Sequence, residues 1–190
     1  MRRSTGVGCL LGCAAFVATA TAAADPQANL GLTMGGVLQN AFGSGSSSGA
    51  FHFGGRADVL FLRDRGNQMA LGPYLDAATA SLHDFDAGGG VDWLLPVRDD
   101  LPIVLSAGAL CRNGEGRSWA PGVEGTIFFG SRSYNFHSWY ELAFGVFAQT
   151  RWIPSSAGMP GVADMVFGVQ WDAEFIAMPS MLILSALRSQ

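Results

Sequence analysis

The sequence predicts an all-β protein: an eight-stranded antiparallel up-and-down β-barrel with a short C-terminal tail that could be helical. Three observations support this prediction. Apolar and polar residues alternate along eight segments, close to the length of about 9–11 residues that a tilted strand needs to cross a bilayer. The chain holds 26 glycines, which suit turns and close-packed strands. Charged residues make up only 14% of the chain, against roughly 25% in an average soluble domain.

The first two predicted strands lie at residues 29–38 and 50–62, on either side of a Gly/Ser-rich loop at 39–49. The first alternates weakly, and the second has the clearest pattern in the chain. Its odd-numbered positions are apolar or glycine, whereas its even-numbered positions include Arg56 and Asp58. Because successive side chains of a strand point to opposite sides, this segment has one apolar and one polar face.

The other six predicted strands repeat this two-faced pattern, with single polar or charged residues near their centres. These strands are residues 68–82, 90–97, 103–112, 118–129, 138–152 and 162–176. In the same order, their polar faces carry Tyr74 and Asp76, Asp92, Ser106 and Arg112, Glu124 and Thr126, Glu141 and Arg151, and Asp164, Asp172 and Glu174. Polar or glycine-rich turns connect them at 63–67, 83–88, 98–102, 113–117, 130–137 and 153–161. An even number of such strands is typical of a closed membrane barrel.

Alternation by itself does not decide which face lines the interior. A soluble barrel that binds an apolar ligand would place the apolar face inside and the charges outside. The membrane arrangement is favoured because the charges are isolated among glycine, alanine and serine, which suits the narrow interior of eight strands. Aromatic residues also lie towards the ends of apolar faces, as in an interfacial belt: Trp93, Trp119, Tyr140, Trp152 and Trp171. We therefore predict a membrane barrel, with a soluble periplasmic or secreted ligand-binding barrel as the alternative.

With the polar face inside, the charged residues would form a network in the interior. Its predicted members are Arg56, Asp58, Tyr74, Asp76, Asp92, Glu124, Glu141, Arg151, Asp172 and Glu174. Buried charges must pair or be hydrated, because an unpaired buried charge is very costly. The simplest interpretation is a structural network that fills the barrel. Acids outnumber arginines in it, and surplus carboxylates share protons or bind cations, so a narrow cation-preferring pore is a second alternative.

In form, this pattern resembles the small eight-stranded outer-membrane barrels, the class of the OmpA transmembrane domain and OmpX. The resemblance covers the whole mature chain and rests on the pattern rather than on a motif. It implies a non-enzymatic protein with a structural or interaction role in the outer membrane of a Gram-negative bacterium. Its expected partners are outer-membrane lipid and the barrel insertion machinery. The chain departs from this class because residues 178–190 continue past the last strand, where such barrels end in an aromatic residue.

The N-terminus has the features of a secretory signal. Arg2 and Arg3 precede an apolar run and the small-residue sequence TAAA, a suitable cleavage site. As an alternative, the sequence LLGC resembles a bacterial lipoprotein box, which would place a lipid on Cys13. The chain is thus expected to divide into a signal peptide at 1–24, a barrel at 25–177 and a tail at 178–190.

The charge of the mature chain argues against nucleic acid as a partner. Removing the signal takes away two arginines and leaves 9 of the 11 basic residues against 15 acidic ones, so the formal charge changes from −4 to −6. A chain that binds nucleic acid usually carries a basic patch and a positive net charge.

The sequence contains no strong catalytic or cofactor motif, so we predict no enzymatic activity, no cofactor and no metal. The stretch 83–86 offers His and Asp side chains as potential metal ligands, but a polar turn is the simpler interpretation. His137 and Ser138 lie near Glu141, as in a hydrolytic site. Neighbouring residues of a strand face opposite ways, however, so the His–Ser contact that this chemistry needs is not arranged locally.

Overall fold

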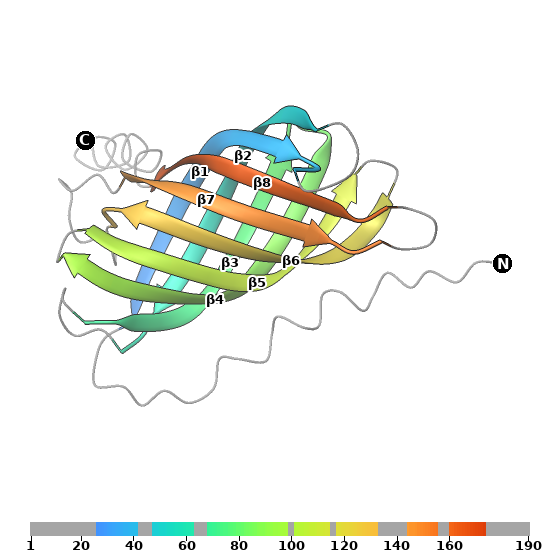
Figure 1. Ribbon diagram of the computed structural model, residues 1–190. Coiled ribbons are helices and arrows are strands. Elements are labelled where there is room, and N and C mark those ends of the chain that lie inside the picture. The colour runs from blue at the N-terminus through green and yellow to red at the C-terminus, as the bar shows by residue number, and fades with distance from the viewer. Residues whose placement is uncertain are drawn as a thin grey trace, which may run out of the picture.

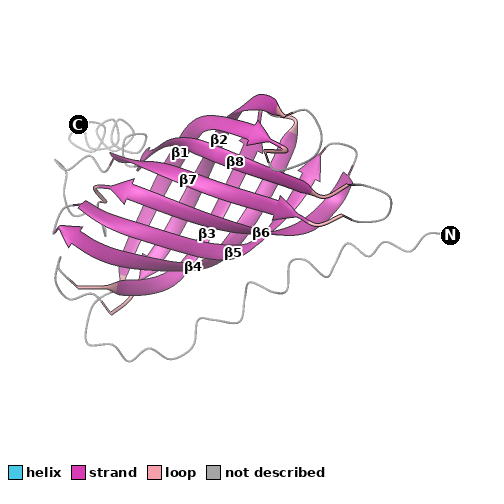
Figure 2. Ribbon diagram, viewed as in Figure 1, coloured by secondary structure: helices cyan, strands magenta, loops and turns pink. Residues whose placement is uncertain are grey.

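The structure, a computed structural model, describes residues 26–41, 47–62, 68–98, 101–114, 117–132, 144–155 and 160–173. Within these residues, eight antiparallel strands follow one another in chain order and close into a barrel through the pairing of β1 with β8 (Figure 1). The strands are β1 (Gln27–Gln39), β2 (Ser48–Leu60), β3 (Ala70–Ala80), β4 (Asp84–Arg98), β5 (Leu101–Gly114), β6 (Arg117–Gly130), β7 (Phe144–Ile153) and β8 (Val162–Asp172). Strands make up nearly all of the described chain (Figure 2). The predicted eight-stranded up-and-down barrel is confirmed.

Several predicted features lie outside the described residues. They are the signal at 1–24, the tail at 178–190, residues 138–143 of the seventh predicted strand and residues 174–176 of the eighth. Among the residues that are described, no helix is long and apolar enough to span a membrane.

Among the described residues, the largest difference from the predicted strand boundaries lies at the start of β4. The predicted turn at 83–88 is wrong, because β4 already begins at Asp84 and pairs with β3 from that residue onward. The connection is instead a tight turn in which Ser81 and Leu82 have φ angles of 49° and 62°. Asp and Gly have low β propensity, so this half of β4 resembles a turn in the sequence. In the barrel it has pairing partners on both sides, and these override the local preference.

The strands are strongly inclined to the barrel axis. Register partners lead once around the barrel from Leu94 on β4 through Val104, Phe128, Phe147, Gly168, Gly35, His52 and Ala80 back to Asp84 on β4. The circuit thus returns to β4 ten residues from its start, at position 84 instead of 94. With strands about 4.8 Å apart and a rise of about 3.3 Å per residue, this stagger gives a tilt of about 40° and a radius of about 8 Å. Long side chains from opposite walls can therefore meet across the interior.

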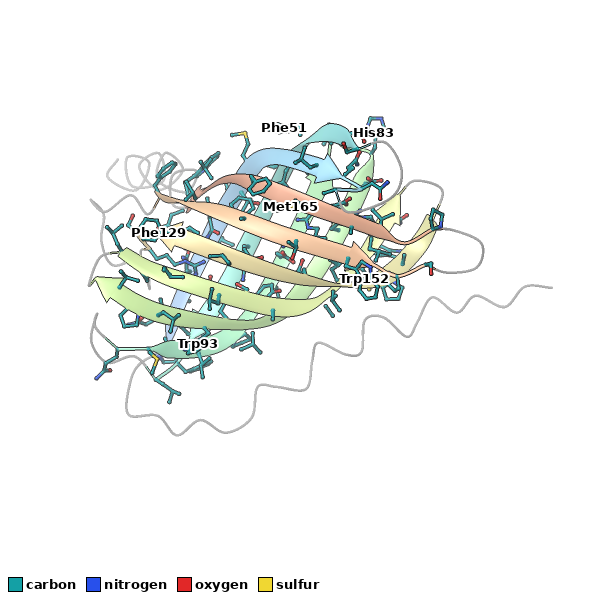
Figure 3. The ribbon with its side chains drawn as sticks, viewed as in Figure 1. Phe51, His83, Trp93, Phe129, Trp152 and Met165 are labelled. Carbon is teal, nitrogen blue, oxygen red and sulfur yellow. The ribbon has the colours of Figure 1, made fainter. Side chains whose placement is uncertain are left out.

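The two faces of the barrel wall differ in charge. Every charged strand residue whose side chain is described points into the barrel, and the outward positions of the strands are apolar or uncharged. Inside, Arg56 is 5% exposed and Asp92 is 0% exposed, whereas outside, Leu75 is 59% exposed and Ile127 is 56% exposed. Trp152 likewise lies on the outer surface (Figure 3). This arrangement is the inverse of a soluble barrel, which keeps its apolar face inside.

Apolar side chains also occupy the interior towards both rims. A buried row crosses β3 to β6 near the rim where β1 starts and β8 ends: Ala70, Leu94, Val104 and Phe128. A second buried cluster lies nearer the opposite rim: Leu110, Ala120 and Ile153. Charged side chains share the interior with these apolar groups, since Ala120 is the register partner of Arg112.

Candidate functional site: the charged interior

A first ion pair, centred on Arg56, lies next to the apolar row. Arg56 on β2 donates hydrogen bonds to Asp92 on β4 (2.5 Å) and to Ser106 on β5 (2.6 Å). Its guanidinium also lies over the ring of Tyr74 on β3, 3.8 Å from the centroid. A charged pair this deeply buried needs several further contacts to offset the loss of hydration. Arg56 makes these contacts with three other strands and so ties four strands together.

Arg132 forms a second ion pair towards the same rim, although it lies beyond the end of β6. Its Nη1 donates a hydrogen bond to Asp58 Oδ2 at 2.6 Å, and its guanidinium lies over the ring of Phe128, 4.5 Å from the centroid. Both side chains of this pair are 1% exposed. The segment that leaves β6 therefore turns a cation back into the barrel. Sequence reasoning missed Arg132 because this residue falls in a predicted connection.

A larger ion-pair group lies towards the opposite rim and joins four strands. Arg112 on β5 binds both carboxylate oxygens of Asp86 on β4, at 2.6 and 2.9 Å, and donates to Asp164 on β8 at 2.6 Å. Arg151 on β7 also donates to Asp86, at 2.8 Å. The backbone N–H of Asn40, just past β1, donates to the second oxygen of Asp164 at 2.9 Å. The bidentate geometry of Arg112 fixes the relative orientation of Arg112 and Asp86.

Two carboxylates in the middle of the barrel accept hydrogen bonds from neutral donors. Tyr74 donates to Glu124 Oε1 at 2.7 Å, and the Gln149 amide donates to Glu124 Oε2 at 3.0 Å and to Asp76 Oδ2 at 3.3 Å. The Gln149 carbonyl accepts a hydrogen bond from Arg151 at 2.8 Å. This last bond orients the amide so that its N–H groups face the carboxylates. Gln149 thereby connects the middle of the barrel to the larger ion-pair group.

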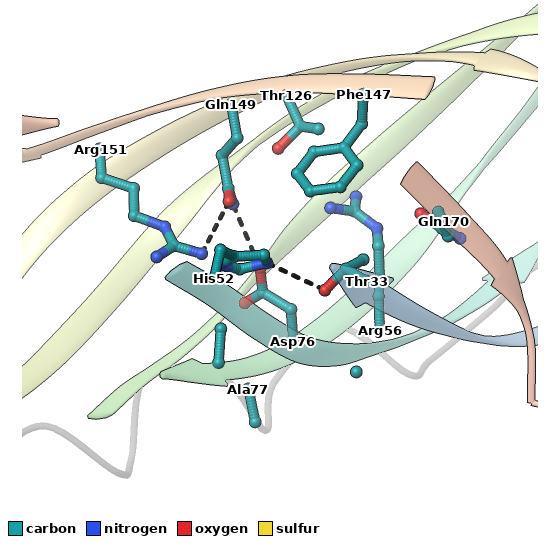
Figure 4. Close-up of a pocket in the computed structure, with 12 residues that line it drawn as sticks. Thr33, His52, Arg56, Asp76, Ala77, Thr126, Phe147, Gln149, Arg151 and Gln170 are labelled. Carbon is teal, nitrogen blue, oxygen red and sulfur yellow. Dashed lines mark hydrogen bonds between the residues drawn. The ribbon is translucent and has the colours of Figure 1, made fainter. Parts of the chain in front are cut away.

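A cavity of about 20 Å³ lies beside these residues (Figure 4). Its lining includes Arg56 from the first ion pair and Arg151 from the larger group. It also includes His52, whose Nε2 lies 3.0 Å from Thr33 Oγ1 and whose ring packs against Phe147 with centroids 5.7 Å apart. The volume is close to that of one water-sized probe, roughly 10–15 Å³, and far below that of a pocket for an organic ligand.

The structure places most of the predicted network residues in the interior. Those inside are Arg56, Asp58, Tyr74, Asp76, Asp92, Glu124, Arg151 and Asp172. Glu141 and Glu174 lie outside the described residues. The prediction omitted three central members of the larger group: Asp86, Arg112 and Asp164. Asp86 was missed because its half of β4 was predicted as a turn, although it shares the even numbering of Asp92 on the same strand.

Carboxylates outnumber arginines among the described interior residues. The carboxylates are Asp58, Asp76, Asp84, Asp86, Asp92, Glu124, Asp164 and Asp172. The arginines are Arg56, Arg112, Arg132 and Arg151. The interior is therefore acid-rich. In its middle, Asp76 and Glu124 accept hydrogen bonds from the neutral side chains of Tyr74 and Gln149.

The potential metal ligands at 83–86 are not brought together. His83 is exposed on the turn, whereas Asp84 and Asp86 are buried inside the barrel. In the part of the chain that the structure describes, no three His, Cys, Asp or Glu residues are arranged to hold a metal ion. His137 and Ser138 lie outside that part.

No protein-family model and no curated protein sequence matches the chain. Among solved structures, the chain is similar to Ail, the attachment invasion locus protein of Yersinia pestis, crystallised with the heparin analogue sucrose octasulfate. The two share 10% sequence identity with a TM-score of 0.41, over 77% of this chain and 98% of Ail. The eight-stranded barrel is shown by the strand pairing itself.

Proposed function

We propose that the protein is an exported, non-enzymatic barrel of the Gram-negative outer membrane, with a structural or interaction role and an interior filled by its own charged network. The observation that carries this proposal is the inverted wall, with uncharged residues outside and charges inside. An apolar surface that surrounds the whole barrel would aggregate in water, whereas lipid solvates it. A closed barrel also leaves no unpaired strand edge in the hydrocarbon.

The spacing of exposed aromatic residues supports a bilayer-sized apolar band. On β4, Phe85 and Trp93 both face outward and are eight residues apart, which is about 26 Å along the strand. With a tilt of about 40°, this separation is about 20 Å along the barrel axis. Trp119 packs edge-on against Phe85, with centroids 6.2 Å apart, and extends that aromatic group onto β6. Outer-membrane barrels have an apolar band about 25 Å tall between two such groups.

A soluble barrel would require the opposite arrangement, with apolar side chains inside and charged side chains outside. A secreted or periplasmic barrel that binds an apolar ligand needs an apolar interior with room for that ligand. Here the described interior holds ion pairs, and the cavity within it has a volume of about 20 Å³. We therefore set this alternative aside in favour of the membrane barrel.

A narrow cation-preferring pore is the second candidate, supported by the surplus of carboxylates in the interior. Bonds across the lumen oppose it. Arg112 reaches Asp164 from β5 to β8, and Tyr74 reaches Glu124 from β3 to β6. A closed network is therefore the better-supported role for these residues. Steady cation-selective current through the purified protein in a planar bilayer would favour the pore.

Envelope fractionation with gel electrophoresis tests the main proposal. The full-length chain is expressed with its N-terminal segment, and the outer-membrane fraction is run with and without boiling. We expect the protein in this fraction, with faster migration in the unboiled sample, because a closed barrel resists detergent. A matched chain that lacks residues 1–24 should stay out of the outer membrane, since the export signal and access to the insertion machinery are lost. Release of the full-length chain as a soluble periplasmic protein without a heat shift would refute the proposal.

A further inference from the structure

The tight turn between β3 and β4 presents an apolar side chain outside the barrel. Leu82 is 87% exposed, more than any other large apolar residue that the structure describes. The His83 N–H donates to the Ala80 carbonyl at 3.0 Å and closes the turn around Ser81 and Leu82. The Ser81 N–H donates to the Phe51 carbonyl at 2.7 Å, which attaches the turn to β2. The backbone therefore fixes the position of Leu82, although its side chain makes little contact with the protein.

The backbone conformation of this turn is unfavourable for leucine. Ser81 and Leu82 have φ angles of 49° and 62°. Two-residue hairpin turns with positive φ at both positions strongly prefer Asn-Gly or Gly-Gly, because a β-carbon clashes with the following carbonyl oxygen in the left-handed region. A strained residue is a reason to look for a function. Because the exposed leucine gains little from the protein itself, we look for its partner outside the chain.

The opposite end of the same wall repeats this combination. Leu62 follows Phe61 at the end of β2, has a φ angle of 68° and is 56% exposed. Phe61 is held to Leu71 by two backbone hydrogen bonds of 2.8 and 3.3 Å. Exposed leucines in a costly conformation thus occur at both ends of the wall that β2 and β3 form. A partner that covers this wall over its full height would contact both.

The height of this wall matches the thickness of a membrane. Leu71, which pairs with Phe61, and Ser81, which bonds to Phe51, are ten residues apart along the chain. With a rise of about 3.3 Å per residue and a tilt of about 40°, they are about 25 Å apart along the barrel axis. The apolar band of outer-membrane barrels is about 25 Å tall. Both turns therefore lie at the edges of such a band.

We propose that Leu82 and Leu62 contact the apolar chains of the lipid at the two edges of the membrane and anchor this side of the barrel at its depth. Phe51 on β2 and Phe85 on β4 face outward next to the Leu82 turn and are 53% and 47% exposed. Leu82 therefore extends the apolar outer surface of the barrel, and this continuity identifies lipid as the partner. The inference rests on the proposed location in the outer membrane.

Methyl NMR of the purified protein in nanodiscs of dimyristoyl phosphatidylcholine locates Leu82 directly. The protein is deuterated except at its leucine methyl groups, and the signals missing from the spectrum of L82A identify Leu82. We expect nuclear Overhauser effects from these methyl groups to the lipid chain protons. Effects to water protons alone would overturn the proposal.

Variants of the two leucines give an independent test by stability. L82A and L62A shorten the side chain but keep the β-carbon, so the backbone cost stays nearly the same. L82N introduces a residue that tolerates positive φ but is polar. If the leucines contact lipid, all three variants should lower the urea midpoint of unfolding in vesicles of the same lipid. An unchanged midpoint in either alanine variant, or a raised midpoint in L82N, would overturn the proposal.

L75A distinguishes failure of this inference from failure of the proposed location. Leu75 lies near the middle of β3, faces outward and is 59% exposed. A lower midpoint for L75A together with an unchanged midpoint for L82A would refute the anchor and leave the membrane barrel intact. Unchanged midpoints in both variants would refute the membrane location and the anchor together.

Discussion

The outer face and the interior of this barrel are built from the same eight strands, one residue after the other, yet they are stabilised in different ways. On β6, Ile127 and Phe129 face outward and need only an apolar surrounding, whereas Glu124 and Thr126 face inward. Outside, one apolar residue can replace another with little consequence. Inside, each charge depends on named partners from other strands. The specific contacts of this protein therefore lie in its interior, whereas its exterior presents an apolar surface.

The interior itself has two kinds of region. At Arg112 and at Arg56, a buried cation is bound directly by carboxylates. In the middle, Asp76 and Glu124 accept hydrogen bonds from the neutral side chains of Tyr74 and Gln149. Removing a charge should therefore lower the free energy of unfolding strongly in the first kind of region and only slightly in the second.

The largest expected effect comes from breaking the larger ion-pair group. Replacing Arg112 with Leu leaves Asp164 without its arginine and Asp86 with only Arg151. We expect a loss of about 3–5 kcal/mol in the free energy of unfolding, because a buried charge without its partner is strongly destabilising. Urea titration in lipid vesicles, read from the boiled and unboiled gel bands, measures this loss.

The control for this variant removes the whole set of charges at once. A quadruple variant with Leu at Arg112, Arg151, Asp86 and Asp164 should recover part of the loss, since apolar side chains can replace a complete buried ion-pair group at little cost. A single variant as stable as the parent protein would show that the interior does not depend on these pairs.

A charge placed on the outer face gives the next largest effect. Phe167 lies at the middle of β8 and faces outward. Replacing it with Arg should cost about 2–4 kcal/mol if this position lies at the bilayer midplane, and Trp119→Arg near the rim should cost about 0–1 kcal/mol. Folding into vesicles of defined lipid measures both. Equal costs at the two positions would contradict a membrane around the barrel.

The smallest effect is expected in the middle of the interior. Asp76→Asn removes one negative charge from an acid-rich region and keeps an oxygen that can accept from Gln149. We expect a change below about 1 kcal/mol in the free energy of unfolding, typical of one neutral hydrogen bond. Asp92→Asn is the matched comparison, because it deprives Arg56 of its carboxylate and should cost clearly more. If the two variants lose the same stability, the distinction between the two regions is wrong.

Much of the fold follows from the sequence because the side-chain period of a strand is local. Because side chains alternate along a strand, the sequence alone assigns Arg56 and Asp58 to the polar face of their strand and Tyr74 to the polar face of the next. The number of strands and their antiparallel order follow in the same way from the polar turns. The first half of β4 was predicted as part of a turn at 83–88. Asp and Gly favour turns locally, and only pairing with both neighbouring strands holds these residues in the sheet.

Only the tertiary structure decides which face is inside and which charges meet. Arg112 and Asp164 are 52 residues apart, and they pair because the stagger of the closed barrel brings β5 and β8 to matching heights on opposite walls. Arg132 enters the interior from beyond its strand, where no alternation applies. By itself, then, the sequence determined the strands and the composition of their two faces. Closure of the barrel decided the pairing, because strand register and the reach of long side chains across the lumen depend on all eight strands at once.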